Sequence, residues 1–234
     1  MKCSVILHAA ELKNADLRGK TAVVIDAFRA TSVMVEGLFN GASAFIPVEA
    51  VDEARRLKEA NPEMLLGGER DGVRIEGFDL DNSPLSYGRE VVQNRKVVLT
   101  TTNGTRALTG SAMADEVFLG SFLNLSAVAQ RVAGSKELVL VCSGSNDTIS
   151  LEDSVCAGAI LYHVELLKSI EWTDNAFMFK SLYLYVASAL TEYLSSGSHY
   201  KYLYDKGFGA DLDFCLQLNR RSVVPRFDGY EVKL

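Results

Sequence analysis

The stretch Lys96-Val97-Val98-Leu99-Thr100-Thr101-Thr102-Asn103-Gly104-Thr105-Arg106 leads from an apolar run into a polar corner that precedes a helical pattern. The apolar, β-branched residues 97–100 predict a strand. Residues 104–111 predict a helix, with Thr102 or Asn103 as its N-cap and Gly104 easing the turn. A strand followed directly by a helix is the repeating unit of an α/β fold.

The same alternation extends from this corner in both directions along the first 142 residues. Strands are predicted at residues 4–7, 22–26, 44–48, 64–66, 97–100, 117–119 and 138–142. Helices are predicted at residues 32–40, 52–60, 104–111 and 124–132. This pattern predicts a three-layer α/β fold, with a mainly parallel or mixed sheet flanked by helices on both faces.

Residues 149–203 change character, because they carry helical patterns and no strong strand signal. Helices are predicted at 149–169 and 175–196, as a C-terminal helical layer or small lobe. The tail 223–227 is predicted to return as an edge strand, since Pro225 is tolerated there. We therefore expect one α/β domain over residues 1–234, with a possible helical sub-lobe at about 150–205. An apolar, tyrosine-rich stripe in that region suggests packing or a homodimer contact.

Composition excludes several functional classes. The 234 residues carry a net charge of -6, which argues against a general nucleic-acid binder. No apolar run reaches the roughly 18 residues that span a bilayer, and the start of the chain is too short and too quickly charged for a signal peptide. We therefore expect no membrane partner and a cytoplasmic location. The four cysteines show no paired spacing, which argues against a zinc site or a disulfide framework.

Four polar segments follow predicted strands, where ligands bind in parallel sheets. In the first, Asp26 and Arg29 leave a strand together. A carboxylate there can hold a divalent cation and a guanidinium can hold phosphate oxygens, although a structural ion pair is an equal alternative. The second segment, residues 67–84, predicts a long loop that is either functional or simply mobile. Its candidate residues are Glu69, Arg70, Asp79, Asn82 and Ser83.

The third segment is the corner at residues 101–106. Unpaired N–H groups at a helix start and the guanidinium of Arg106 suit an oxyanion. Its candidate residues are Thr101, Thr102, Asn103, Gly104, Thr105 and Arg106. The bland alternative is an ordinary N-cap, which explains only one or two of these residues.

The fourth segment begins at Cys142 and leads into a helix. Ser143 and Gly144 follow the strand, and Glu152 and Asp153 stand near the helix start. The two carboxylates would favour the helix dipole, or would hold a divalent cation as hard oxygen ligands. The three histidines, His8, His163 and His199, belong to no paired spacing, and we expect each to be structural or exposed.

Taken in order, these segments resemble one known family. The ordered set is D-x-x-R-A-T from Asp26, G-E-R-x-G from Gly68, G-F-D-x-x-N-S-P from Gly77, T-T-N-G-T from Thr101, and C-x-G with L-E-D from Cys142. This order is similar to the Mg²⁺-dependent 2-phosphosulfolactate phosphatases, the ComB family of coenzyme M biosynthesis, over about residues 22–160. The chain departs from the family pattern at Asp81, where glycine is expected.

The resemblance implies hydrolysis of 2-phospho-3-sulfolactate to 3-sulfolactate and phosphate, with Mg²⁺ as cofactor. On this reading Asp26, Glu69 and Asp153 would hold the metal, and Glu152 or Asp79 would activate water or support the ligands. The substrate would be held by arginines, hydroxyls and amides at Arg29, Arg70, Asn82, Ser83, Thr101, Thr102, Asn103, Gly104, Thr105, Arg106, Ser143 and Gly144. Direct attack by water is preferred, with Asp26 as the alternative nucleophile.

Two other functions stay open at this point. One is a phosphatase of the same fold that acts on another small phosphorylated acid or a sugar phosphate. The other is a non-catalytic protein that binds small anions, a reading that gives the carboxylates no role. Binding without turnover would distinguish the second from both phosphatases.

Overall fold

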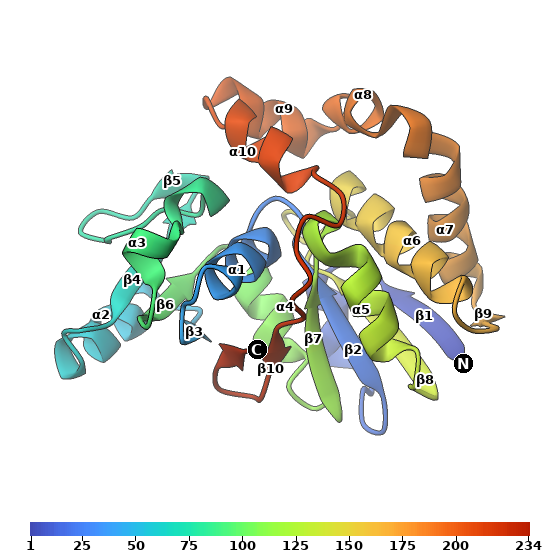
Figure 1. Ribbon diagram of the computed structural model, residues 1–234, viewed down its shortest axis with the longest axis horizontal. Helices are drawn as coiled ribbons and strands as arrows, with labels where there is room; N and C mark the ends of the chain where they lie inside the picture. The colour runs from blue at the N-terminus through green and yellow to red at the C-terminus, as the bar shows by residue number, and fades with distance from the viewer.

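An eleven-stranded mixed sheet runs through the protein (Figure 1), whose computed structural model describes residues 1–234. Its strands are β1 Lys2–Ile6, β2 Thr21–Ile25, β3 Ala44–Pro47, β4 Leu65–Arg70, β5 Val73–Arg74, β6 Lys96–Thr100, β7 Glu116–Gly120, β8 Glu137–Cys142, β9 Glu171–Trp172, β10 Arg226–Phe227 and β11 Val232–Lys233. Their order is β5-β4-β6-β3-β11-β10-β7-β2-β8-β1-β9.

Helices cover both faces of this sheet and continue past it. They are α1 Ala30–Phe39, α2 Val51–Ala60, α3 Arg89–Val92, α4 Gly104–Gly110, α5 Leu125–Val132, α6 Leu151–Glu165, α7 Asp174–Val186, α8 Leu190–Ser195, α9 Ser198–Asp205 and α10 Gly209–Cys215. Four short 3₁₀ helices are η1 Ala9–Asn14, η2 Pro84–Ser86, η3 Phe122–Asn124 and η4 Ala187–Ala189. The predicted three-layer α/β class is confirmed. None of the helices combines the length and the apolar character needed to cross a membrane.

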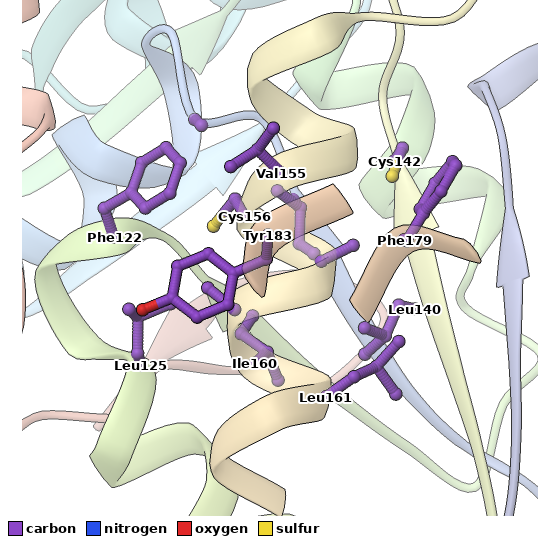
Figure 2. Packing of buried hydrophobic residues seen from close by; sticks show 14 of the residues in the cluster. Phe122, Leu125, Leu140, Cys142, Val155, Cys156, Ile160, Leu161, Phe179 and Tyr183 are labelled. Carbon is purple, nitrogen blue, oxygen red and sulfur yellow. The ribbon is translucent and has the colours of Figure 1, made fainter. Parts of the chain in front are cut away.

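The central strands are buried on both faces, which explains why they read as unbroken apolar runs. Along β2, Val23 and Ile25 belong to one core cluster, while Ala22 and Val24 belong to another. The first cluster lies against α5, α6 and α7, and Figure 2 shows Ile160 of α6 within it beside side chains of the sheet and α7. The second lies against α1 and α4.

The C-terminal hairpin occupies the middle of the sheet. Strands β4, β6 and β3 are parallel to one another, as are β7, β2, β8, β1 and β9. Between these groups, β10 pairs antiparallel with β7, and β11 pairs antiparallel with β3. The predicted edge strand at 223–227 is therefore wrong about the edge. Pro225 is tolerated because pairing begins after it, and its carbonyl accepts the Leu119 N–H at 3.0 Å.

Two further differences concern element boundaries. Strand β4 continues through Gly67 and Gly68 into Arg70, where a loop was predicted. Gly68 has φ of +139°, and a Cβ there would lie 2.0 Å from the carbonyl oxygen of Thr100, so only glycine permits this close approach. The helical region also contains β9, a two-residue strand paired with β1 that the sequence pattern did not indicate.

Helices α7 to α10 form an arch that positions the last part of the chain over the sheet. The region predicted as one helix at 175–196 is divided into α7, η4 and α8. Figure 1 shows α9 and α10 crossing above the ends of the central strands. The C-terminal third of the chain therefore reaches the place where polar residues leave the strands.

Candidate active site

A polar cavity of about 500 Å³ lies where polar segments leave several strands. Its lining comes from the ends of β2, β4, β6 and β8 and from α9: Asp26, Phe28, Arg29, Glu69, Asp71, Gly72, Asn82, Thr101, Thr102, Asn103, Ser145, Asn146, Ser198, His199, Tyr202 and Leu203. The two parallel groups run in opposite directions in the sheet. Residues that follow strands of both groups nevertheless line this one cavity.

Asp26 directly follows β2 and is almost fully buried. Its Oδ1 accepts the Ala30 N–H at 3.1 Å, whereas Oδ2 has no hydrogen-bond partner in the protein. A Cβ at Gly104 would lie 2.6 Å from Oδ2, so glycine there leaves room for this carboxylate. Burial raises the pKa of Asp26 to about 6; the Ala30 hydrogen bond and His199 oppose the rise, and Glu69 and Glu152 add to it.

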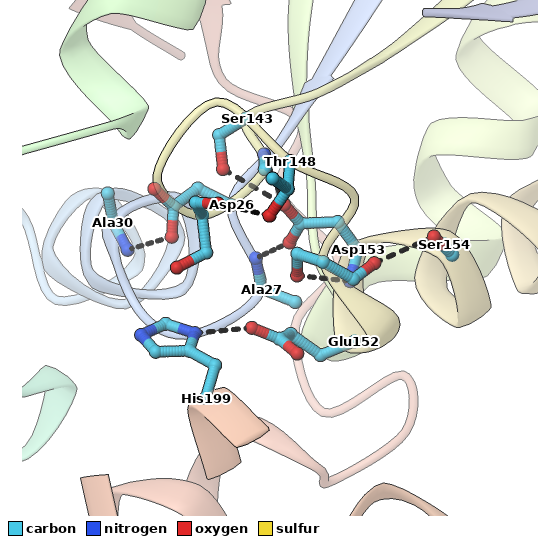
Figure 3. Close-up of polar contacts among 12 residues, drawn as sticks. Asp26, Ala27, Ala30, Ser143, Thr148, Glu152, Asp153, Ser154 and His199 are labelled. Carbon is cyan, nitrogen blue, oxygen red and sulfur yellow. Dashed lines mark hydrogen bonds and ion pairs between the residues drawn. The ribbon is translucent and has the colours of Figure 1, made fainter. Parts of the chain in front are cut away.

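Asp153, on α6, is buried behind the cavity and holds two loops together. Its Oδ1 accepts the Ala27 N–H at 2.8 Å, and its Oδ2 accepts the Ser143 hydroxyl at 2.9 Å and the Gly144 N–H at 3.1 Å (Figure 3). Burial raises the pKa of Asp153 well above its usual value, and the charges of Asp26 and Glu152 raise it further. Both oxygens of Asp153 are therefore occupied by protein donors.

Glu69, at the end of β4, joins two of the predicted segments. Its Oε1 accepts the N–H and the hydroxyl of Thr102 at 2.9 and 3.0 Å, and its Oε2 accepts the Gly72 N–H at 2.7 Å. These three hydrogen bonds hold the corner at 101–106 against the end of β4. The two segments therefore present Glu69, Thr101, Thr102 and Asn103 to the same cavity.

Arg29 is 1% exposed, and its guanidinium is held from three sides. Nη1 donates to Asp211 Oδ2 at 2.5 Å, and Nη2 donates to the Gly72 carbonyl at 3.0 Å. The guanidinium also lies 4.1 Å from the centre of the Phe208 ring. Asp211 in turn accepts the Ser83 hydroxyl at 2.6 Å, so Ser83 serves this network behind the cavity.

His199, which the sequence predicts to be structural or exposed like the other two histidines, lies at the cavity and contacts Glu152. Its Nδ1 lies 2.5 Å from Oε1 of Glu152, and its ring lines the cavity. Burial lowers the pKa of His199, but the hydrogen bond to Glu152 and the charges of Glu152, Asp26 and Asp153 outweigh burial and raise it. No motif surrounds His199 in the sequence, so only the fold reveals this contact.

Other predicted residues point elsewhere. The Arg70 guanidinium donates to the carbonyls of Glu69 and Glu49 and to the Thr100 hydroxyl. Asp79 accepts the Leu66 N–H at 2.8 Å, and Arg106 pairs with Asp147 at 3.0 Å near the surface. Ten of the predicted site residues lie outside the cavity lining: Arg70, Asp79, Ser83, Gly104, Thr105, Arg106, Ser143, Gly144, Glu152 and Asp153. Asp81, where the chain departs from the family pattern, lies outside it as well.

Whether a magnesium ion fits this cavity depends on which side-chain oxygens are free of hydrogen bonds. No group of three or more His, Cys, Asp or Glu side chains could enclose a metal ion. Asp26 Oδ2 is free, and Oδ1 of Asn82 is buried without a partner. Mg²⁺ commonly takes one or two carboxylates, keeps several waters and binds substrate phosphate, so it needs no complete protein cage. The free oxygens of Asp26 and Asn82, in a cavity that Glu69 also lines, therefore fit a magnesium ion.

The fold and the cavity define the general class, an α/β protein with a polar small-molecule site at its strand ends. Residues 6–229 match the family model described as 2-phosphosulpholactate phosphatase. The chain is 43% identical to a protein of Clostridium perfringens (strain SM101 / Type A), with 100% of this chain and 96% of that protein aligned. It is 42% identical to a protein of Caldicellulosiruptor saccharolyticus, with 97% of each aligned, and both relatives are named "Probable 2-phosphosulfolactate phosphatase".

The chain therefore belongs to the 2-phosphosulfolactate phosphatase family, a family of phosphoric monoester hydrolases. The match extends well beyond residues 22–160, where the motifs lie. It includes α9 and α10, which supply His199 and Asp211.

Proposed function

We propose that this protein hydrolyses 2-phospho-3-sulfolactate to 3-sulfolactate and phosphate and needs Mg²⁺ to do so. The observation that supports this most strongly is the cavity itself, which is lined by Asp26, whose Oδ2 is free, and by the buried Arg29. Family membership supports the reaction type and the substrate.

In this proposal Oδ2 of Asp26 and the side-chain Oδ1 of Asn82 would hold Mg²⁺, which would also bind the substrate phosphate and water. The ion, when bound, draws charge from the phosphoryl group and so lowers the barrier to attack by water. Glu69 and Asp153, which the family resemblance suggests as ligands, act here as positioning residues, since their oxygens already accept hydrogen bonds from the protein.

The remaining polar groups hold the substrate. Arg29 lines the cavity with a permanent charge that Asp211 and the Gly72 carbonyl hold in a fixed place, and in this proposal it faces one of the three anionic groups of the substrate. Thr101 and Asn103 offer hydroxyl and amide groups along one wall of the cavity, where Thr102 is held by its two hydrogen bonds to Glu69. Arg106 lies outside the lining and would reach a substrate only by leaving Asp147.

Phosphate release from racemic 2-phosphosulfolactate, measured with Mg²⁺ and with EDTA, tests the proposal. Phospholactate and phosphoglycerate serve as competing substrates. We expect metal-dependent turnover with a strong preference for the sulfonate. Equal rates on all three compounds would remove the substrate from the proposal, and binding without turnover would favour the non-catalytic alternative.

We further propose that the enzyme acts in the cytoplasm, in coenzyme M biosynthesis, and that it forms a homodimer. Exposed apolar side chains on the outer face of α7 support the last point, among them Met178 and Tyr185. The mass from sedimentation velocity would test the dimer directly.

A further inference from the structure

We propose that His199 is the general acid of the reaction, which protonates the departing ester oxygen, and that Glu152 positions its imidazole. This inference rests on the proposed function. It assigns a catalytic residue outside the motifs that carry the family resemblance, on a helix that follows them by about forty residues in the chain.

The geometry separates the two ring nitrogens of His199. Nδ1 lies 2.5 Å from Oε1 of Glu152, while Nε2 has no hydrogen-bond partner in the protein. Glu152 is 3% exposed, so the imidazole is anchored on its buried side. Figure 3 shows the ring beside Glu152 and close to the Asp26 region. Nε2 is therefore the free donor of a ring that lines the cavity.

Such a donor would accelerate hydrolysis of this substrate. The leaving group is the alkoxide of a secondary alcohol, which is far too basic to depart unprotonated at an appreciable rate. Other donors that line the cavity suit the task less well. The Tyr202 hydroxyl donates to the Asp71 carbonyl at 2.9 Å, and Arg29 does not give up its proton in proteins. Imidazole is the side chain best suited to give up a proton near neutral pH.

The charges that face His199 favour its protonated form. Glu152 and Asp153 face it from α6, and Asp26 faces it from the residue after β2. The hydrogen bond to Glu152 and these three charges together outweigh the effect of burial on the pKa of His199. Glu69 and Asp71 line the same cavity from β4 and the turn after it, and Arg29, the cation at the start of α1, is already paired with Asp211. His199 therefore meets mainly carboxylates, which keep its proton in place until the ester bond breaks.

The proposed step is balanced without a further reactant. Water oxygen bonds to phosphorus, and the bond from phosphorus to the ester oxygen breaks, with its electron pair going to that oxygen. The ester oxygen takes the proton from Nε2 and leaves as the alcohol. The phosphate product retains both protons of the water and then loses one to solvent, and the neutral imidazole regains one from solvent.

The test compares two leaving groups in the full-length enzyme with Mg²⁺. We expect His199→Asn to lower kcat on 2-phosphosulfolactate by about 10²-fold or more. On p-nitrophenyl phosphate, whose phenolate departs without a proton, we expect a loss of less than about fivefold, since no acid catalysis is needed there. Glu152→Gln should give an intermediate loss with the same substrate pattern. His163→Gln, on α6 and outside the cavity lining, is the matched control.

The pH profile gives a second reading. Wild-type kcat on 2-phosphosulfolactate should fall as the pH rises through the pKa of His199, and this alkaline limb should be missing in His199→Asn. Equal losses on both substrates, or an unchanged alkaline limb, would overturn the inference and leave His199 a structural residue. If the wild-type enzyme released phosphate from neither ester, the proposed function itself would fail. If the enzyme hydrolysed 2-phosphosulfolactate but not p-nitrophenyl phosphate, the alkaline limb of the pH profile would by itself decide whether His199 is the general acid.

Discussion

Asp26 carries its charge at a place where burial disfavours it. It is 7% exposed, it lies near Glu69 and Glu152, and its pKa rises from 3.8 to about 6. A carboxyl group with a raised pKa binds its proton more tightly in the folded protein than in the unfolded chain. Its ionisation therefore lowers the free energy of unfolding as the pH rises from about 4 to about 6. Above pH 6 the whole of this loss of stability remains.

Asp26→Asn should consequently be inactive but more stable than the wild type in EDTA. At pH 7.5 we expect a gain in the free energy of unfolding on the order of 1–3 kcal/mol, since each pKa unit corresponds to about 1.4 kcal/mol. The gain should fade as the pH falls from 6 to 4. Urea unfolding at several pH values measures it. Asp52→Asn, at an exposed position on α2, should change neither quantity. Equal stability of Asp26→Asn and wild type at pH 7.5 would contradict the raised pKa.

The residues that were predictable from the sequence are those that follow strands directly. Asp26, Arg29, Glu69, Asn82, Thr101, Thr102 and Asn103 were predicted for the site and all line the cavity. Their roles stay predictions. His199 and Asp211 could not be found in this way, because their contacts with Glu152 and Arg29 join positions 47 and 182 residues apart. Such pairings are set by the path of the chain, which local patterns do not describe.

At the scale of elements, α10 acts on the cavity through one buried ion pair. The Asp211 carboxylate accepts hydrogen bonds from the Arg29 guanidinium and the Ser83 hydroxyl. It therefore connects helices α7 to α10 to the residue before α1 and to the residue before η2. Removing one partner of a buried pair leaves the other charge without compensation, which commonly costs about 3–5 kcal/mol. Helix α10 therefore helps to position Arg29, a residue of the cavity lining.

Asp211→Asn should release Arg29 from its fixed position while keeping the shape of the side chain. We expect KM to rise about tenfold or more with a smaller change in kcat, and the free energy of unfolding to fall by about 2–4 kcal/mol. Asp213→Asn, at an exposed position on the same helix, is the matched control and should behave as wild type. Steady-state kinetics and urea unfolding on both variants separate the outcomes. An unchanged KM in Asp211→Asn would show that Arg29 does not depend on α10.

The prediction of elements succeeded where hydrophobic pattern and turn chemistry agree. The seven strands and four helices predicted up to residue 142 are all present, with boundaries displaced by a few residues. Prediction failed where pairing partners decide the outcome. Strand β9 has only two residues and exists because β1 offers a free edge. Strand β4 extends through Gly67 and Gly68 because they pair with Leu99 and Thr100 of β6. Neither cause can be read from a local run of residues.

At the scale of the whole molecule, the C-terminal hairpin joins the two parallel halves of the sheet. Phe227 of β10 pairs with Val117 of β7, and Val232 of β11 pairs with Phe45 of β3. Both hairpin side chains are buried in the cluster that also contains Val24 and Leu119. Since the cavity draws on strands of both halves, their relative placement depends on the last ten residues of the chain.

Phe227→Ala should therefore destabilise the whole protein and not a terminal segment alone. Truncating a buried phenylalanine commonly costs about 3–5 kcal/mol. Tyr230, in the exposed turn of the same hairpin, is the matched control, and Tyr230→Ala should stay within about 0.5 kcal/mol of wild type. If residues 1–234 form one domain, fluorescence and circular dichroism should report one coincident urea transition in both variants. A separate early transition in Phe227→Ala, with the cavity intact and activity retained, would show that the two halves are held together by contacts other than the hairpin.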